Sequence, residues 1–385
     1  MRRRDFVRAA AAALPFARAA AAAPDPPGRG TPTPQVPKAQ EPGVATVALH
    51  YMTWLNERAW LFASTWPVLH DPSFALPQGY DSLDPLIIAE HNRRAERHGF
   101  AWLWSWWGRT DLAGNDATLR HYLDVDPGAT VPLLILHEST GILEANANGF
   151  FDFDNPVNSR RFVDDVAFLD RTYWSNPLYA RRFLRVDGRP VLFTWVSRNF
   201  TGAWPEAVAA ARREAGLYLV GSEFGLDLQP DGTPGVRPDL AEALAPLDAV
   251  SAYGIYDPRY VSPSGHLDDA YRGRYEQAVR GWAELVTRVA PGVGFVPPLQ
   301  FAFDDRYVRP EARHPPLLST VEEAVAAAKV TRGLLDDART GDPRYRSVRP
   351  VVFLVSWNEH LEGSAVEWTD EHGYGYVMAA DRAFR

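Results

Sequence analysis

The stretch DPLIIAEHNRRAERHGFAWLWSWWG, residues 84–108, runs from a helix pattern directly into a strand pattern. Asp84 followed by Pro85 is typical of a helix start, because the carboxylate caps free backbone amides and proline has no amide to satisfy. Gly99 is a helix stop, and an almost continuous apolar run follows it. Strands that are apolar on both faces are typical of a parallel sheet covered on both sides.

The same alternation recurs along the chain. Seven further apolar runs are expected to form strands: 45–54, 131–138, 189–196, 217–225, 248–256, 292–303 and 349–359. Further helix patterns span 158–174, 204–215, 267–290 and 320–338. Eight strand–helix units predict the α/β class and a single (β/α)8 TIM barrel over residues 44–385. An open doubly wound sheet is the alternative, but its usual Gly-rich phosphate loop after the first strand is missing.

The first 43 residues are expected to lie outside the barrel. Residues 1–23 combine an Arg cluster, an Ala-rich stretch and small residues, which is the layout of an export signal peptide. RRDFVRA, starting at Arg3, resembles a twin-arginine signal and predicts use of the twin-arginine export machinery and a periplasmic or secreted protein. A membrane anchor is the alternative, although Arg18 interrupts a stretch shorter than the roughly 20 residues of a spanning helix. Residues 24–43, rich in Pro and Gly, are expected to form a linker.

The composition limits the classes of partner and cofactor. The formal charge is −8 and no basic run occurs in the body, so nucleic acid is not an expected partner. The chain has no cysteine, which excludes disulfides and Cys-ligated metals. His91 and His98 share one helix face but lack a third ligand, so we expect no metal and no other cofactor.

Carboxylates, amides and aromatic rings gather at the predicted C-terminal strand ends, which form the active site of a barrel of this kind. Aromatic rings stack on the C–H faces of sugars, while carboxylates and amides bind hydroxyls, so the set predicts a carbohydrate site. The alternative for the tryptophans is the core, to which we assign Trp102. The expected substrate-binding residues are Tyr51, Trp54, Trp106, Trp107, His137, Glu138, Tyr253, Trp357 and Asn358.

Two glutamates, Glu359 and Glu362, follow the last predicted strand. Val355, Trp357 and Glu359 share one strand parity, so we expect all three to face the barrel lumen. Glu362 precedes Gly363, where the chain can fold back, so both carboxylates can face one sugar. Glycosidases need such a pair, one group to protonate the leaving oxygen and one to act at the anomeric centre.

Four stretches resemble motifs of glycoside hydrolase family 99, the endo-α-mannosidases and endo-α-mannanases. They are YMTW at 51–54, the segment 80–108, LHE at 136–138 and SWNEHLEG at 356–363. The resemblance implies a retaining endo-hydrolase that cleaves mannan-like polysaccharides or oligosaccharides without a metal. It also implies that Glu359 is the base for the sugar 2-hydroxyl, and that Glu362 is the general acid and then the general base.

Four positions depart from the family pattern. His360 and Leu361 stand where the family has Trp and His, and Ser139-Thr140 follows Glu138 where the family prefers Pro-Tyr. A related group of polysaccharide-biosynthesis proteins shares an Asn-Glu-Trp-x-Glu-Gly ending. A glycan-binding or polysaccharide-biosynthesis protein that has a hydrolase-like barrel and no hydrolytic turnover is therefore the alternative function.

Overall fold

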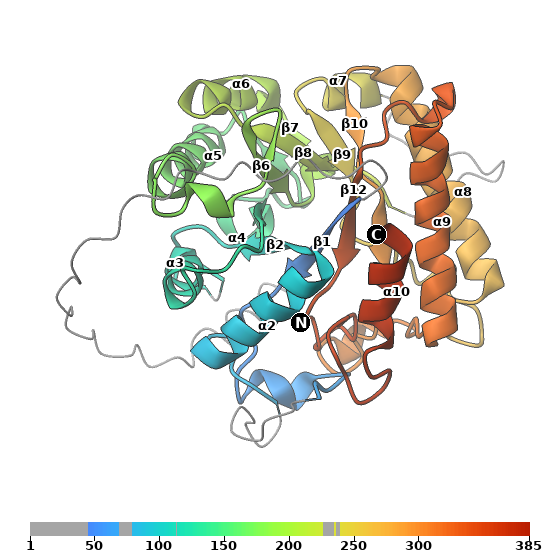
Figure 1. The fold of residues 1–385 in the computed structure, drawn as a ribbon. Coiled ribbons are helices and arrows are strands. Elements are labelled where there is room, and N and C mark those ends of the chain that lie inside the picture. The colour runs from blue at the N-terminus through green and yellow to red at the C-terminus, as the bar shows by residue number, and fades with distance from the viewer. Residues whose placement is uncertain (1–44, 69–78, 113, 226–234, 236–238) are drawn as a thin grey trace.

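The computed structural model describes residues 45–68, 79–112, 114–225, 235 and 239–385. The predicted signal peptide (1–23) and linker (24–43) lie outside these residues. The described chain forms a curled parallel sheet with helices around it (Figure 1).

Each predicted apolar run contains at least one strand of this sheet. In spatial order the strands are β10 (Gly294–Phe295), β9 (Ala249–Ser251), β8 (Tyr218–Ser222), β6 (Arg189–Thr194), β3 (Leu133–His137), β2 (Ala101–Trp106), β1 (Thr46–Tyr51), β12 (Val351–Val355) and β11 (Pro298–Gln300). Neighbours in this order pair in parallel. The short β5 (Arg185–Val186) pairs antiparallel with β6, and β4 (Phe151–Asp152) pairs with β7 (Phe200–Thr201) outside the main sheet.

The two ends of the strand order, β10 and β11, are separated in the chain by only Val296 and Pro297. The Val296 amide donates to the carbonyl of Val250 in β9 at 2.9 Å. The Phe353 amide of β12 donates to the Pro297 carbonyl at 3.1 Å. The continuous segment from β10 to β11 therefore bonds to β9 on one side and to β12 on the other. It brings the two ends of the curled sheet together, which an open doubly wound sheet would not do.

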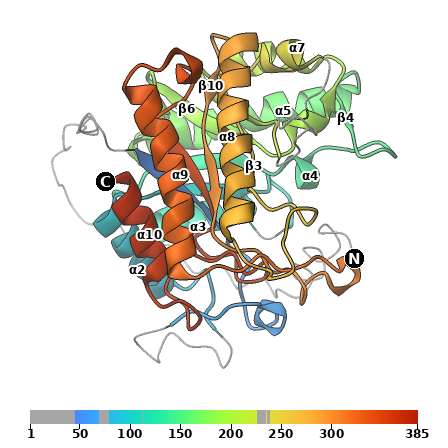
Figure 2. The same ribbon diagram turned by 90° about the vertical axis from the view of Figure 1, so that its right-hand side faces the viewer.

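Helical segments separate consecutive strands of the curled sheet everywhere except between β10 and β11. The longer helices are α2 (Pro85–His98), α3 (Asp116–Val125), α5 (Pro156–Leu169), α6 (Trp204–Glu214), α8 (Asp269–Val289), α9 (Val321–Arg339) and α10 (Gly375–Phe384). Short helical segments are η1 (Ala59–Phe62), α4 (Ser139–Ile142), η3 (Asp170–Trp174), η4 (Ala180–Arg182), η5 (Ser197–Asn199), α7 (Leu240–Leu244), η6 (Pro310–Ala312) and η7 (Pro343–Tyr345). Figure 2 shows α8, α9 and α10 side by side on one flank. No described helix is long and apolar enough to cross a membrane.

The local signals at α2 act as the sequence predicted. The Asp84 side chain accepts from the Leu86 amide, and Gly99 ends the helix in the left-handed conformation at φ 63°. At α9, Thr320 and Glu323 form a reciprocal capping box. These caps satisfy backbone groups that the helix itself leaves free.

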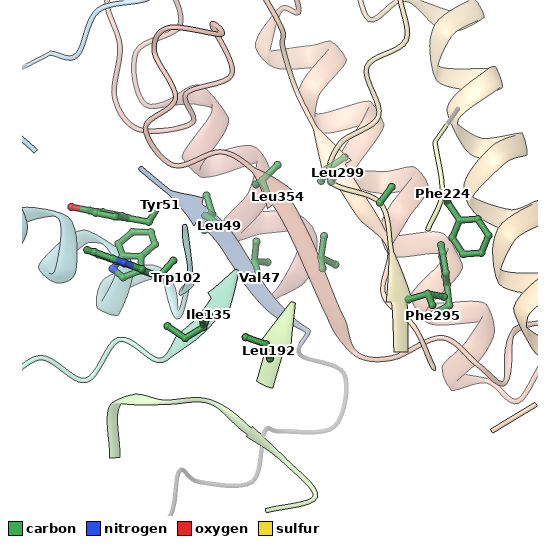
Figure 3. Close-up of a cluster of buried hydrophobic side chains, with 14 of the residues drawn as sticks. Val47, Leu49, Tyr51, Trp102, Ile135, Leu192, Phe224, Phe295, Leu299 and Leu354 are labelled. Atoms are coloured by element: carbon green, nitrogen blue, oxygen red, sulfur yellow. The ribbon is translucent and has the colours of Figure 1, made fainter. Parts of the chain in front are cut away.

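The strands present two apolar faces, because successive side chains alternate. The centroid of the Phe193 ring of β6 lies 5.2 Å from that of the Phe353 ring of β12, although three strands lie between β6 and β12 in the order. Only the interior of the curled sheet allows that contact, so Phe193, Phe353 and the side chains that share their parity face the lumen. The opposite parity packs against the helices and includes Val47, Leu49, Tyr51, Trp102, Ile135, Leu192 and Leu354 (Figure 3).

Several connecting segments lie together beyond the C-terminal strand ends. The Ser64 amide donates to the His360 carbonyl at 2.8 Å, and the Ser64 hydroxyl donates to the Asp304 carbonyl at 2.6 Å. At the opposite end of the sheet, the Ala45 amide donates to the Phe384 carbonyl at 3.2 Å. The beginning and the end of the described body therefore meet at the N-terminal strand ends.

Candidate active site

The lumen becomes polar toward the C-terminal strand ends. The side chain of Ser105, near the end of β2, donates to Glu138 Oε1 at 2.6 Å, and both residues are buried. The Tyr253 ring lies 4.5 Å from the ring of His50 and 4.2 Å from that of Trp195. Glu138 and Tyr253, two of the predicted site residues, are thus placed at this end of the lumen among hydroxyl and aromatic groups.

Trp54 and Trp107 form part of an apolar cluster beyond the lumen. Their rings meet edge to face at 6.3 Å, and Tyr253 and Leu361 pack against the same cluster. Gly141 makes room for the indole, because a Cβ there would lie 2.2 Å from Trp107 Cε3. Both predicted residues therefore lie next to Tyr253, although their side chains are buried.

The segment after β12 folds into a tight turn that carries both predicted catalytic residues. The Glu359 amide donates to Ser356 Oγ at 2.7 Å, and the Ser364 amide donates to the Glu359 carbonyl at 3.1 Å. Gly363 adopts φ 61°, a left-handed conformation that glycine tolerates best. Glu359 and Glu362 are only 2% and 6% exposed, so the turn places two buried carboxylates at the end of β12.

Glu362 is held by the segment that follows β11. The Arg309 guanidinium pairs with the Glu362 carboxylate and also with Asp305 Oδ2 at 2.7 Å. His314 Nδ1 lies 2.9 Å from the same Asp305 oxygen. A guanidinium partner favours the charged form of a carboxylate, whereas a general acid must carry a proton.

Four predicted substrate-binding residues face away from the lumen, and Tyr51 and Trp106 are two of them. Tyr51 stacks on Trp104 with 5.2 Å between ring centroids, and its hydroxyl bonds to His91 Nδ1 at 3.0 Å. Trp106 stacks with Phe168 in the helix layer. The parity of the second strand therefore puts the Trp106 ring in the outer core, as the alternative interpretation of the tryptophans held.

His137 and Trp357 are the other two predicted substrate-binding residues that face away from the lumen. His137 Nε2 lies 3.2 Å from Asp165 Oδ2 of α5. Trp357 contacts Trp102 at 5.1 Å, so the prediction that Trp357 faces the lumen with Val355 is wrong. The regular alternation of side chains ends with β12 at Val355, and the parity rule no longer holds beyond it.

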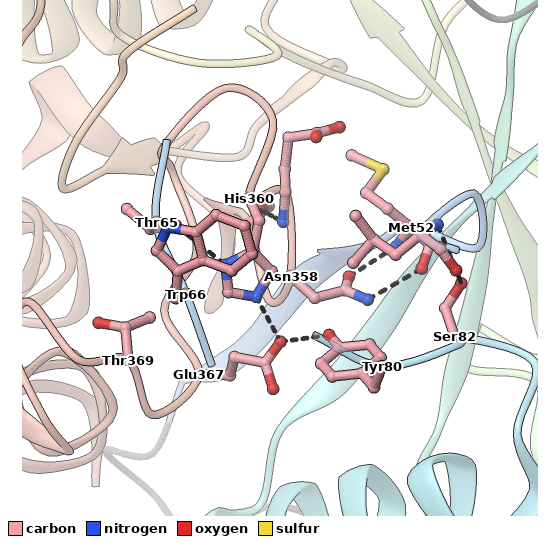
Figure 4. Close-up of polar contacts among 12 residues, drawn as sticks. Met52, Thr65, Trp66, Tyr80, Ser82, Asn358, His360, Glu367 and Thr369 are labelled. Carbon is pink, nitrogen blue, oxygen red and sulfur yellow. Dashed lines mark hydrogen bonds and ion pairs between the residues drawn. The ribbon is translucent and has the colours of Figure 1, made fainter. Parts of the chain in front are cut away.

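Asn358 is engaged with the backbone. Its carbonyl accepts from the Met52 amide at 2.8 Å, and its amide group donates to the Met52 carbonyl at 2.9 Å (Figure 4). The side chain is fully buried. It joins the segments after β1 and β12 and has little capacity left for a sugar.

A buried polar network that was not predicted from the sequence lies next to the turn. We call it the Glu367 network, and it consists of Tyr80, His91, His360 and Glu367 (Figure 4 shows Tyr80, His360 and Glu367). Burial would raise the pKa of the Glu367 carboxyl, but the imidazoles of His91 and His360 outweigh burial and hold this pKa well below its ordinary value. Burial and the Glu367 charge raise the pKa of Tyr80 well above its ordinary value. The available sequence signal was a lone glutamate in the apolar run 365–368.

No metal site was found among the residues that the structure describes. A cavity of about 410 Å³ borders the ends of β6 and β8 and is lined by Arg198, Asn199, Glu223 and Asp239 together with apolar groups. Neither Glu359 nor Glu362 lines this cavity.

Comparisons with known proteins point to one type of fold. No family model and no curated protein sequence matches the chain. A solved structure titled "Glycoside hydrolase-like protein" matches with a TM-score of 0.64 and 15% identity, covering 93% of this chain and 98% of that one. The GH99 endo-α-mannosidase from Bacteroides thetaiotaomicron, in complex with Bis-Tris-propane, matches with a TM-score of 0.52 and 15% identity, covering 87% and 95%. At such identities the similarity shows that the chain has a glycoside hydrolase-like fold.

Proposed function

We propose that this protein is an exported glycoside hydrolase, a retaining and endo-acting enzyme like the α-mannosidases and α-mannanases, that cleaves a mannan-like polysaccharide or oligosaccharide. The observation that carries the proposal is the turn after β12, which holds two buried carboxylates, Glu359 and Glu362, three residues apart at the C-terminal strand ends. Paired carboxylates at this end of a barrel are the groups that glycoside hydrolysis requires.

The two glutamates have different roles in this proposal. Glu359 takes the proton of the sugar 2-hydroxyl, whose oxygen attacks the anomeric carbon while the glycosidic C–O bond breaks. Glu362 gives its proton to the leaving oxygen, and then takes a proton from the water whose oxygen bonds to the anomeric carbon. The bond between the anomeric carbon and the 2-oxygen breaks at the same time, and Glu359 returns its proton to the 2-oxygen. Arg309 must release Glu362 for the first of these proton transfers, because its guanidinium favours the charged carboxylate.

The lumen end supplies the groups that bind the sugar. Glu138 accepts hydroxyl hydrogens beside Ser105, and Tyr253 presents a partly exposed ring next to Trp195. Trp54 and Trp107 support Tyr253 from the apolar cluster beyond it. Tyr51, Trp106, His137 and Trp357 have no direct contact with the sugar in this proposal, because they lie between the sheet and the helices.

A glycan-binding protein without turnover is the second candidate. The ion pair between Arg309 and Glu362 favours it, because the predicted proton donor is paired as an anion. In that case the strand ends would hold a sugar while the glycosidic bond stays intact.

Glutamine variants distinguish the two functions. Glu362→Gln should be nearly inactive on yeast α-mannan and recover in part on an aryl α-mannoside-terminated oligosaccharide, whose leaving group needs no proton. Glu359→Gln should stay slow on both substrates. General acid–base help is worth about 10²–10⁴-fold in rate, so new reducing ends measure the losses easily.

The matched control is Glu322→Gln, on the exposed start of α9, which should keep full activity. Full activity of either site variant would remove that residue from the mechanism. Binding of α-mannan by the parent protein, with no reducing ends at stoichiometric enzyme, would favour the glycan-binding function.

The export part of the proposal is supported by the sequence of residues 1–23. Replacing Arg3 and Arg4 by lysine should leave the precursor in the cytoplasm, because the twin-arginine machinery reads the pair. Cell fractionation measures the outcome, and unchanged export of the variant would rule out this route.

A further inference from the structure

The Glu367 network surrounds a carboxylate that is 1% exposed. Glu367 Oε1 accepts from the Tyr80 hydroxyl and lies 2.8 Å from His360 Nε2, while Oε2 lies 3.1 Å from His91 Nε2. An unpaired charge at this depth would strongly destabilise the folded protein, because burial removes the water that solvates a carboxylate. The partners on both oxygens make the buried charge tolerable.

Each histidine uses its second nitrogen on a hydroxyl group. His360 Nδ1 lies 2.9 Å from Thr65 Oγ1, and His91 Nδ1 lies 3.0 Å from the Tyr51 hydroxyl. With the proton on Nε2, both rings donate to Glu367 and accept from these hydroxyls. The network is then fully satisfied. It joins the end of β1, the segment after η1, the segment before α2, the middle of α2 and the turn.

His360 connects this network to the catalytic turn through its own backbone. It lies between Glu359 and Glu362 in the chain, and its amide donates to the Asn358 carbonyl at 3.0 Å. Its carbonyl accepts from the Ser64 amide at 2.8 Å and from the Gly363 amide at 3.3 Å. The residue at the centre of the turn is thus fixed by its side chain as well as by its main chain.

We infer that His360 and Glu367 are positioning residues, which hold the backbone of the turn so that Glu359 and Glu362 keep their directions toward a bound glycan. The effect on turnover rests on the proposed function of the two glutamates. The effect on the turn itself does not, because it follows from the hydrogen bonds alone. Neither His360 nor Glu367 touches the sugar in this arrangement.

The test compares variants of the full chain by hydrogen exchange and by kinetics. Glu367→Gln removes the charge, His360→Leu removes both ring nitrogens, and His360→Gln keeps one N–H donor. We expect Glu367→Gln and His360→Leu to speed exchange of the Glu359 and Ser364 amides at least tenfold, while amides of α8 stay protected. His360→Gln should keep most of the protection, as a conservative replacement that can still donate to Glu367.

The matched control is His98→Leu. His98 is also a buried histidine of α2 and lies 3.2 Å from a carboxylate, Asp381, but it is the last residue of the helix, seven positions after His91. This variant should lower the melting temperature without faster exchange at the turn. On yeast α-mannan, the two disruptive variants should lower kcat at least tenfold with little change in KM, whereas His98→Leu should leave kcat unchanged.

Two results would overturn the inference. One is turn exchange in Glu367→Gln and His360→Leu that matches His98→Leu, and the other is equal disruption by His360→Gln and His360→Leu. The exchange measurements need no substrate, so they decide the inference even if the parent protein leaves α-mannan intact. Failure of the proposed function would appear separately, as full activity of the Glu359→Gln or Glu362→Gln variant or as binding without cleavage.

Discussion

Replacement of Arg309 by methionine tests whether the ion pair with Glu362 behaves as a buried one. The Glu362 side chain is 8% exposed and that of Arg309 is 19% exposed. Removing one partner of a fully buried pair costs about 3–5 kcal/mol, whereas exposed pairs contribute about 0–1 kcal/mol. Arg309 also pairs with Asp305, which is 1% exposed, so we expect Arg309→Met to lower the free energy of unfolding by about 2–4 kcal/mol.

Arg306 provides a control in the same segment. It pairs with Asp304 through two hydrogen bonds at 2.9 and 2.8 Å, but its side chain is 51% exposed. Arg306→Met should therefore cost less than about 1 kcal/mol in urea denaturation.

A double-mutant cycle isolates the pair itself. In a Glu362→Gln background, Arg309→Met should cost at least about 1 kcal/mol less than in the parent, because the buried charge is already gone. Equal losses for Arg306→Met and Arg309→Met would refute the reasoning from burial. An unchanged loss in the Glu362→Gln background would show that Arg309 acts through groups other than Glu362.

Two further predictions concern stability. Burial lowers the pKa of His372 to about 4, so the unfolded chain binds a proton between about pH 6.5 and 4 that the folded protein does not. The free energy of unfolding should fall as the pH drops through this window, by at most about 3.4 kcal/mol before solvent screening is included. The His372→Gln variant should flatten the slope of the urea midpoint against pH, whereas the exposed His121→Gln variant should not. Gly141→Ala should destabilise the protein by about 1–3 kcal/mol because the new methyl group meets Trp107, whereas Gly273→Ala, in open space within α8, should stabilise it by about 0.5–1 kcal/mol. Thermal melts measure this pair, and equal shifts would contradict the packing argument.

The strands were predictable because a parallel sheet covered on both sides needs continuous apolar runs, and each such run contains a strand. The face of the sheet to which an individual side chain points was not predictable. His137 and Glu138 are neighbours, so only one can face the lumen, and the sequence gives no sign of which. Parity along β12 was the right rule up to Val355, but Trp357 lies beyond the strand end, where the rule no longer applies.

Helices α3, α7 and α10 were not foreseen, and neither was the Glu367 network. In α3, the Asn115 cap and the burial of Leu119 and Tyr122 offset weak local propensity, and such packing is visible only in three dimensions. His91 and Glu367 are 276 residues apart in the chain. A single sequence holds no signal for a pairing at that separation, although the lone buried glutamate marks one end of it.

The hydrogen bond between Ala45 and Phe384 bears on how the protein can be tethered. Both ends of the body emerge at the N-terminal strand ends, and the two glutamates lie at the other end of the same strands. An anchor, a fusion partner or a resin that is attached through either end of the body therefore lies on the side of the N-terminal strand ends. The strand ends that carry Glu359 and Glu362 then point away from the support, so a large molecule can approach them without obstruction from the attachment.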